Sequence, residues 1–249
     1  MKRGAAMLFS ALFYPLLAVY TLLAVPLLAL GVAAGAPFAP HRTSMRRFRR
    51  AIAWYGNGII RGLARPAVRI RYESPARTPG TARIFVANHV AASDPFLMAV
   101  LPEEVVQVVN LWPFRLPVWG RFARWAGYLN IRALEPGVFQ ARAARLLAEG
   151  VSIVGFPEGT RAGTRPVGAF HGALFRLALA TRAPLVPLCI AGNARTPARG
   201  SLLLEPATIR IRCLPELSWE QFGGWSPFQF KTRVRQMIQD ELTRMGACA

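Results

Sequence analysis

The sequence contains very few of several residue types on which protein chemistry often depends. Its 249 residues include two lysines, two aspartates, three histidines and three cysteines. The cysteines lie far apart and form no CxxC pair, which argues against a zinc knuckle or a disulfide framework and is compatible with a reducing compartment. Because histidine and aspartate are so rare, a reaction that needs a histidine–carboxylate pair has few candidate residues here.

Acidic residues are scarce as well, and this leaves a large positive excess. Against 12 acidic residues stand 31 basic ones, 29 of them arginine, for a net charge of +19. Yet 53% of the chain is hydrophobic, which argues against a disordered basic tail. Zinc, helix-turn-helix and RNP-type signatures of nucleic-acid binding are missing, so we expect no nucleic-acid partner. An apolar, strongly basic chain suits anionic membrane lipid or anionic substrates, although codon bias remains an alternative source of the arginines.

The first forty residues predict a membrane segment. No charged residue occurs from Gly4 to Pro40, a length that suits one tilted helix or, with Pro15 and Pro26 inside it, a helical hairpin in one leaflet. The basic cluster that follows favours a location of the rest of the protein on the cytoplasmic side of the cell inner membrane. A cleaved signal peptide is the alternative, but its apolar core would be too long and its downstream flank too basic.

A basic, aromatic segment follows and defines the expected domain boundary. Residues 44–66 mix arginines with aromatic and aliphatic side chains, a composition typical of a segment in the headgroup layer. An ordinary surface helix is the alternative. We therefore expect residues 1–66 to form a membrane anchor with a basic interfacial segment, and residues 67–249 to form one catalytic domain.

The remainder predicts an α/β domain with a mixed central sheet flanked by helices. Short apolar runs typical of strands buried on both faces alternate with helical patterns. The expected strands are 68–72, 83–87, 105–109, 151–156, 185–191 and 208–213. The expected helices are 95–101, 117–127, 136–149 and 169–181, with a terminal amphipathic helix over 230–245.

A first chemical motif, Asn88-His89-x4-Asp94, directly follows the strand ending at Ala87. A carboxylate on one imidazole nitrogen fixes the tautomer and makes the other nitrogen a better base. No GxSxG elbow is present and no cysteine lies nearby in the sequence. The pattern therefore predicts that the substrate supplies the reacting hydroxyl. In the alternative reading, Asp94 only caps a helix and His89 is a turn residue.

A second motif, Phe156-Pro-Glu-Gly-Thr-Arg161, follows the strand 151–156. Open α/β sheets bind ligands at the carboxyl ends of their strands. Gly159 permits close backbone approach, Thr160 offers a hydroxyl group, and Arg161 offers a bidentate fork for phosphate. Alone, this loop is equally compatible with a turn that carries a solvated charge.

The two motifs in this order resemble those of the membrane-associated glycerolipid acyltransferases of the lysophosphatidate (1-acylglycerol-3-phosphate) acyltransferase family. Residues 88–94 match the family's NHx4D and residues 156–161 its FPEGTR block without a change. Weaker likenesses occur around Arg132 and at Val186-Pro187. The chain departs from the family at Asn110 and its neighbours, and at His171, where basic residues are usual. These departures concern the acceptor more than the reaction.

The resemblance implies an O-acyltransferase that moves a fatty acyl group from acyl-CoA or acyl-carrier protein to the hydroxyl of a lysophospholipid acceptor. The leading acceptor is 1-acylglycerol-3-phosphate, which would give phosphatidate. By this likeness His89 is the general base and Asp94 orients it. Substrate would be bound by further residues, namely Asn88, Glu158, Gly159, Thr160, Arg161 and Arg132. Asn88 would orient its turn or stabilise an oxyanion, and His171 would be structural or line the acceptor site.

The resemblance implies no metal and no cofactor beyond the acyl donor as co-substrate. Two alternatives to the leading function stay open at this point. One is an acyltransferase for another lysolipid such as a lyso-ornithine lipid, and the other is a non-catalytic membrane lipid-binding module.

Overall fold

The computed structural model describes residues 3–75, 80–116, 118–161, 167–198 and 200–246. The chain divides into two compact units, each assembled from segments distant in sequence. Residues 1–71, 91–104 and 192–209 form the first, here called the anchor unit. Residues 72–90, 105–191 and 210–249 form the second, here called the sheet unit.

The central sheet has seven strands in the order β1-β7-β6-β2-β5-β3-β4. β2 pairs in parallel with β5 and β6, β3 pairs in parallel with β5 and β4, and β7 runs antiparallel to β6. The strands are β1 (Val68–Glu73), β2 (Ile84–Ala87), β3 (Val105–Val109), β4 (Leu129–Asn130), β5 (Ser152–Gly155), β6 (Leu185–Ala191) and β7 (Ala207–Cys213). This is the mixed α/β sheet expected from the sequence.

Strands β2, β5 and β6 lie in the middle of the sheet, where mainly apolar side chains are buried on both faces. Every residue of β2, β5 and β6 is buried, as expected of parallel strands covered on both sides. β7 instead alternates between buried and partly exposed residues at successive positions, the pattern of a strand with one solvated face. β2 thus lies between two buried strands, β6 and β5, and the motif at residues 88–94 directly follows its carboxyl end.

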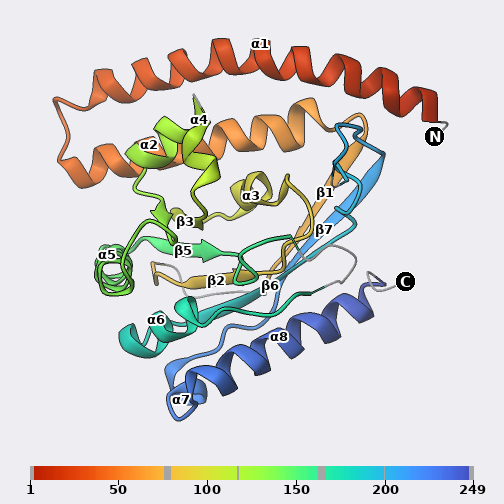
Figure 1. The fold of residues 1–249 in the computed structure, drawn as a ribbon. Helices are drawn as coiled ribbons and strands as arrows, with labels where there is room; N and C mark the ends of the chain where they lie inside the picture. The colour runs from red at the N-terminus through yellow and green to blue at the C-terminus, as the bar shows by residue number, and fades with distance from the viewer. Residues whose placement is uncertain (1–2, 76–79, 117, 162–166, 199, 247–249) are drawn as a thin grey trace. The chain divides into compact units, whose positions relative to one another are not determined.

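Helices of the sheet unit pack against these strands (Figure 1). α5 contacts β5 and α6, and α8 contacts β6 and α6. On α8, Phe230, Val234, Ile238 and Leu242 are buried, so one apolar stripe at helical spacing covers the sheet. The helical segments are η3 (Trp112–Arg115), α4 (Trp119–Trp125), α5 (Pro136–Ala148), α6 (Ala173–Thr181), α7 (Trp219–Phe222) and α8 (Pro227–Arg244).

The anchor unit is built on two long helices that lie side by side (Figure 1). Its helical segments are α1 (Arg3–Gly35), α2 (His41–Asn57), η1 (Gly58–Leu63), α3 (Asp94–Leu97) and η2 (Met98–Val100). α1 continues through both Pro15 and Pro26, so the chain forms a single helix here and not a hairpin turned at Pro26. α1 is long and apolar enough to cross a membrane by length and composition, a test that a signal sequence also passes.

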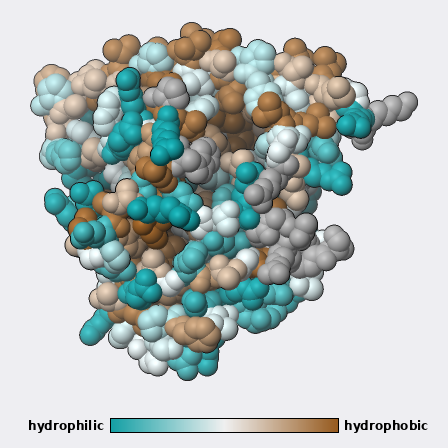
Figure 2. Space-filling view, in the orientation of Figure 1, coloured by the Kyte–Doolittle hydropathy of each residue, from teal (hydrophilic) through white to brown (hydrophobic). Residues whose placement is uncertain are grey.

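Polar side chains tie one side of α1 to the rest of the anchor unit. The Ser10 hydroxyl accepts a hydrogen bond from the Leu204 N–H (2.9 Å), and the Tyr14 hydroxyl donates to the Leu202 carbonyl (2.6 Å). Further along, the Tyr20 hydroxyl donates to the backbone carbonyl of Tyr55 (3.2 Å). Exposed apolar side chains gather over α1 (Figure 2), namely Met7, Leu8, Leu12, Leu16, Val19, Leu22, Leu23, Leu27 and Leu30.

A buried ion cluster joins α2 to the segment before β3. Glu104 accepts hydrogen bonds from both Arg42 and Arg49, each at 2.8 Å. Burial raises the pKa of the Glu104 carboxyl, but hydrogen bonds and charge from the two arginines outweigh this, so its pKa lies below the usual value. The side chains of Glu104 and Arg49 are only 7% and 6% exposed. Removal of one partner would leave an uncompensated buried charge, which is costly.

We expect Glu104→Ala to destabilise the protein by about 3–5 kcal/mol, the usual cost of breaking a buried ion pair from one side. Arg145→Ala is the matched control, because its pair with Glu149 has the arginine 83% exposed and should contribute at most about 0.5 kcal/mol. Denaturant unfolding in detergent measures both. Equal losses in the two variants would show that the Glu104 cluster is dispensable.

The same cluster predicts a dependence of stability on pH. A carboxyl whose pKa is lower in the folded protein stabilises it above the unfolded pKa, near 4.5 for glutamate. This contribution is lost as the pH falls through the lower, folded pKa. The difference in unfolding free energy between the native protein and Glu104→Gln should therefore shrink on acidification below about pH 4.5; a difference that grows there would contradict this assignment.

Candidate active site

The sheet unit brings the first residues of the NHx4D motif and the second motif to one edge of the sheet. β2 and β5 are parallel neighbours, with Ile84 opposite Ile153 and Val86 opposite Gly155. Asn88 and His89 follow β2, and residues 156–161 follow β5. Because carboxyl ends of parallel strands meet at one edge, segments about seventy residues apart in sequence become neighbours.

Asn88 extends the pairing of β2 with β6 by means of its side chain. Its amide donates to the Ile190 carbonyl (3.0 Å), and its Oδ1 accepts from the Ile190 N–H (2.8 Å). The residue is 1% exposed. The side chain thus fixes where the chain leaves β2. Its expected contact with substrate stays a prediction.

Glu158 links the two motifs directly. Its Oε1 accepts a hydrogen bond from the His89 N–H and its Oε2 accepts one from the Gly168 N–H, both at 2.8 Å. The carboxylate is buried, and the His89 ring lies against the Phe156 ring with 4.6 Å between centroids. The structure therefore shows Glu158 as the residue that holds the second loop on the backbone of the first.

Gly159 forms the tight point of the second loop. Its φ of +68° favours glycine, and a Cβ there would lie 3.2 Å from Cδ2 of His171. Its carbonyl accepts from the Asn110 side-chain amide at 2.6 Å. The His171 N–H donates to the Pro157 carbonyl (2.8 Å), so His171 packs on this loop, in keeping with the structural or acceptor-lining role expected for it.

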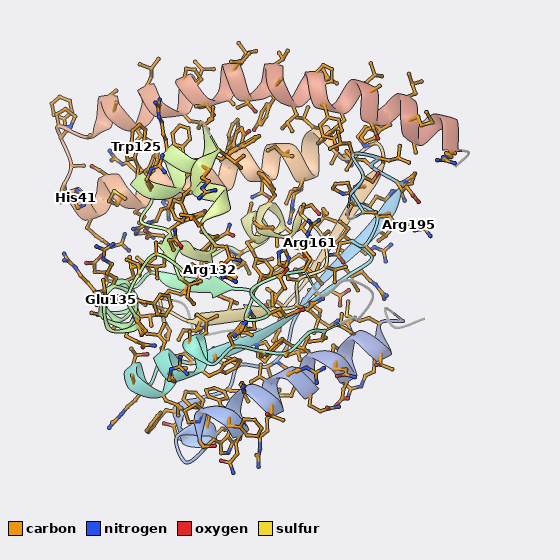
Figure 3. All side chains as sticks on the ribbon, in the orientation of Figure 1. His41, Trp125, Arg132, Glu135, Arg161 and Arg195 are labelled. Carbon is orange, nitrogen blue, oxygen red and sulfur yellow. The ribbon has the colours of Figure 1, made fainter. Side chains whose placement is uncertain are left out.

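The remaining candidates are polar groups on the surface of this edge. Thr160 is exposed and Arg161 is half-buried on the loop after β5, while Arg132 is exposed on the loop after β4 (Figure 3). The Arg132 Nε donates a long hydrogen bond to the Asn110 Oδ1 (3.4 Å). The Asn110 side chain thus contacts both Gly159 and Arg132.

Asp94 lies in the anchor unit, as the first residue of α3. It is fully buried, and its Oδ2 accepts from the Ala91 N–H at 2.9 Å. Its Oδ1 accepts from the Asn193 side-chain amide at 2.6 Å. Sequence reasoning missed Asn193 because it lies 99 residues further along the chain; its only local signal is a polar side chain just after a buried strand.

A cysteine nucleophile is not offered by the buried thiols. Burial raises the pKa of the Cys189 thiol to about 12, so Cys189 supplies almost no thiolate near neutral pH. Cys213 is buried as well. Cys248 lies outside the described residues. Among the residues described, no group of three or more histidine, cysteine or acidic side chains is placed to hold a metal ion.

Replacement of Glu158 by Gln should loosen the turn at His89. Glutamine keeps the shape of glutamate, but its NH2 group replaces one of the two acceptor oxygens. One backbone N–H then faces another N–H and loses its hydrogen bond, which typically costs about 1–3 kcal/mol. Hydrogen exchange in a peptide that contains His89 should accelerate. The exposed Glu149→Gln is the control and should leave exchange unchanged; unchanged exchange in both variants would contradict the linking role of Glu158.

Comparison with known proteins agrees with this geometry. The family model "Acyltransferase" matches residues 69–191. A curated 1-acyl-sn-glycerol-3-phosphate acyltransferase of Cocos nucifera is 27% identical over 149 residues, which is 57% of this chain and 48% of that protein. One from Salmonella typhimurium is 23% identical over 186 residues, 72% of this chain and 74% of that protein. The chain thus spans about half the length of the plant relatives it matches.

A solved structure shares the fold. The crystal structure of the 1-acyl-sn-glycerophosphate (LPA) acyltransferase from Thermotoga maritima superposes with a TM-score of 0.80 at 18% identity, and covers 99% of this chain and 98% of that one. At this identity the likeness concerns the fold. Residues 69–191 therefore form a domain that matches the acyltransferase family, and the relatives and the solved structure that the chain resembles are named as 1-acylglycerol-3-phosphate acyltransferases.

Proposed function

We propose that this protein transfers a fatty acyl group from a thioester donor to the free hydroxyl of a lysophospholipid, with 1-acylglycerol-3-phosphate as the leading acceptor and phosphatidate as the product. The observation that carries the proposal is the hydrogen bond from the His89 N–H to Glu158. It joins the NHx4D and FPEGTR segments at the carboxyl ends of two paired strands, where open α/β sheets bind ligands.

His89 is the general base in this proposal. Its imidazole takes the proton from the acceptor hydroxyl as the oxygen attacks the thioester carbonyl carbon. The tetrahedral intermediate collapses, the C–S bond breaks, and the proton passes to the departing thiol. The five-residue spacing to Asp94 motivates its role in orienting the imidazole. General base catalysis typically contributes about 10²–10⁴-fold, so positioning of both substrates must supply much of the remainder.

The acceptor's phosphate would be held by the loop after β5. Arg161 offers a bidentate fork and Thr160 an exposed hydroxyl beside it. Arg132, tied to Gly159 through Asn110, offers a second guanidinium from the loop after β4. Glu158 and Asn88 position these elements, because their polar atoms bond to the backbone of the sheet unit.

The donor would be acyl-CoA or acyl-carrier protein as a co-substrate, with no metal or other cofactor. Direct attack by the acceptor needs no acyl-enzyme, in agreement with a buried Cys189 whose thiol has a pKa of about 12. The excess of arginine suits both donors, since each carries negative charge.

We further propose that α1 lies in the membrane surface and does not span the bilayer. Ser10 and Tyr14 bond to backbone atoms of residues 202–204, which form neither helix nor strand. Such irregular backbone is not tolerated against lipid hydrocarbon. The exposed leucines of α1 would enter the acyl-chain region, and the exposed arginines of α2, at positions 46, 47 and 50, would meet anionic headgroups, as in interfacial helices. The membrane would be the cell inner membrane, with the catalytic body on its cytoplasmic side.

Replacement of His89 by Ala should abolish acyl transfer while the fold is retained. The measurement is the transfer of a labelled acyl group from acyl-CoA or acyl-carrier protein to 1-acylglycerol-3-phosphate or lyso-ornithine lipid in detergent. We expect kcat to fall by at least about 10²-fold, the usual contribution of a general base. His41→Ala, at the exposed first position of α2, is the control and should keep most of the activity. Equal turnover by the native protein and His89→Ala would contradict the role of His89 as base, whereas no transfer by the native protein to either acceptor would point to a lipid-binding module.

Replacement of Leu22 and Leu27 by Gln should weaken binding to anionic lipid vesicles. Both side chains are exposed on α1 and would become buried in lipid on binding. Loss of two such leucines should lower partitioning into the vesicles by about 10- to 100-fold or more. Phe228→Gln, on α8 of the sheet unit, removes a similarly exposed apolar side chain as a control. Cosedimentation with vesicles measures all three proteins, and equal binding would contradict the interfacial role of α1.

A further inference from the structure

Two hydrogen bonds from within the anchor unit reach the Asp94 carboxylate. The carboxylate is fully buried; its Oδ2 accepts from the Ala91 N–H at 2.9 Å and its Oδ1 accepts from the Asn193 side-chain amide at 2.6 Å. The bond from Ala91 is local, three residues away. The bond from Asn193 arrives from a different part of the chain and fixes the rotation of the carboxylate about its last torsion.

Asn193 is itself placed by a rigid turn. It follows Gly192, whose φ is +84° and where a Cβ would lie 2.3 Å from the Thr208 carbonyl oxygen. The Asn193 carbonyl accepts from both the N–H (3.1 Å) and the hydroxyl (2.9 Å) of Thr196. Asn193 is 2% exposed. Gly192 and Thr196 therefore fix the backbone of the turn, and the Asn193 side-chain amide donates to the Asp94 carboxylate.

We infer that Asn193 is a positioning residue for acyl transfer, acting through Asp94. The inference rests on the proposed function of the His89–Asp94 pair. A carboxylate can orient an imidazole only if its own rotation is fixed. A buried side-chain amide fixes one carboxylate oxygen by a hydrogen bond, and the amide stays neutral at every pH. A purely structural asparagine would be satisfied by any polar partner that keeps the turn folded.

The substitution Asn193→Asp separates these two roles. Aspartate has the same shape, but it can donate to Asp94 only while the two carboxyl groups share a proton. Repulsion between two carboxylates this close favours the shared proton at lower pH, and the donor is lost once the pH is high enough to remove that proton. The ratio of kcat for Asn193→Asp to kcat for the native protein should therefore fall as the pH rises. Asn193→Ala removes the donor at every pH and should lower kcat by about 10- to 100-fold, the rate equivalent of one hydrogen bond to a carboxylate.

The experiment measures kcat, acceptor KM and melting temperature of the full-length protein in detergent across a range of pH. The expected result is a loss of kcat at nearly unchanged acceptor KM in Asn193→Ala, and a pH-dependent ratio in Asn193→Asp. Thr196→Val is the matched control: it loosens the same buried turn, keeps the amide, and should retain most of kcat even where its melting temperature falls.

The outcomes are separable from those of the proposed function. If the native protein and His89→Ala transfer acyl groups equally, the proposed function fails. If the native protein is active and His89→Ala is not, but Asn193→Ala keeps the native kcat, the role of Asn193 is overturned. A loss of kcat in Thr196→Val that matches Asn193→Ala, with a pH-independent ratio in Asn193→Asp, overturns it as well and leaves Asn193 a structural residue.

Discussion

The hydrogen bonds accepted by the Glu158 carboxylate are the interaction on which the sheet-edge site depends. One oxygen takes the backbone N–H of His89 and the other takes that of Gly168. A single buried side chain thereby fixes the turn after β2, the loop after β5 and the segment that leads into α6. Buried backbone N–H groups must find partners, so this carboxylate both satisfies them and brings two distant motifs into register.

In the anchor unit, too, a few polar side chains fix the positions of the helices. On one side of α1, hydroxyl groups at Ser10, Tyr14 and Tyr20 bond to neighbouring segments of the unit, while the leucines of α1 stay exposed. The cluster of Glu104 with Arg42 and Arg49 holds α2 to the segment that also carries α3. A few polar contacts therefore orient a helix whose composition alone leaves its placement open.

Much of the fold follows from local patterns in the sequence. The continuous apolar run at 185–191 and the valine-rich run at 105–109 form β6 and β3 with the expected bounds, because strands buried on both faces need mainly apolar residues. β4 was not predicted, since two residues cannot establish a period. The helix expected over 169–181 begins only at Ala173, because the His171 N–H is bonded to the Pro157 carbonyl of the preceding loop.

Candidate site residues could be predicted where they stand in a local sequence motif. Residues whose contacts are distant in the sequence could not be predicted. His89, Asp94 and the loop 156–161 stand in recognisable motifs, whereas Asn110 and Asn193 act through partners 49 and 99 residues away. A single asparagine has no local pattern that reports such a partner. The same limit applies to Glu158, whose motif is visible but whose bonds to two backbone N–H groups are not.

The central claim is that the acceptor hydroxyl attacks the thioester directly, with His89 as base. It is tested most directly by incubating the protein with radiolabelled acyl-CoA in the absence of lysolipid, denaturing it and counting label on the protein. The account predicts no covalent label without acceptor, and labelled phospholipid once 1-acylglycerol-3-phosphate is added. Stoichiometric labelling of the protein that is then chased into phospholipid would show an acyl-enzyme and contradict the account.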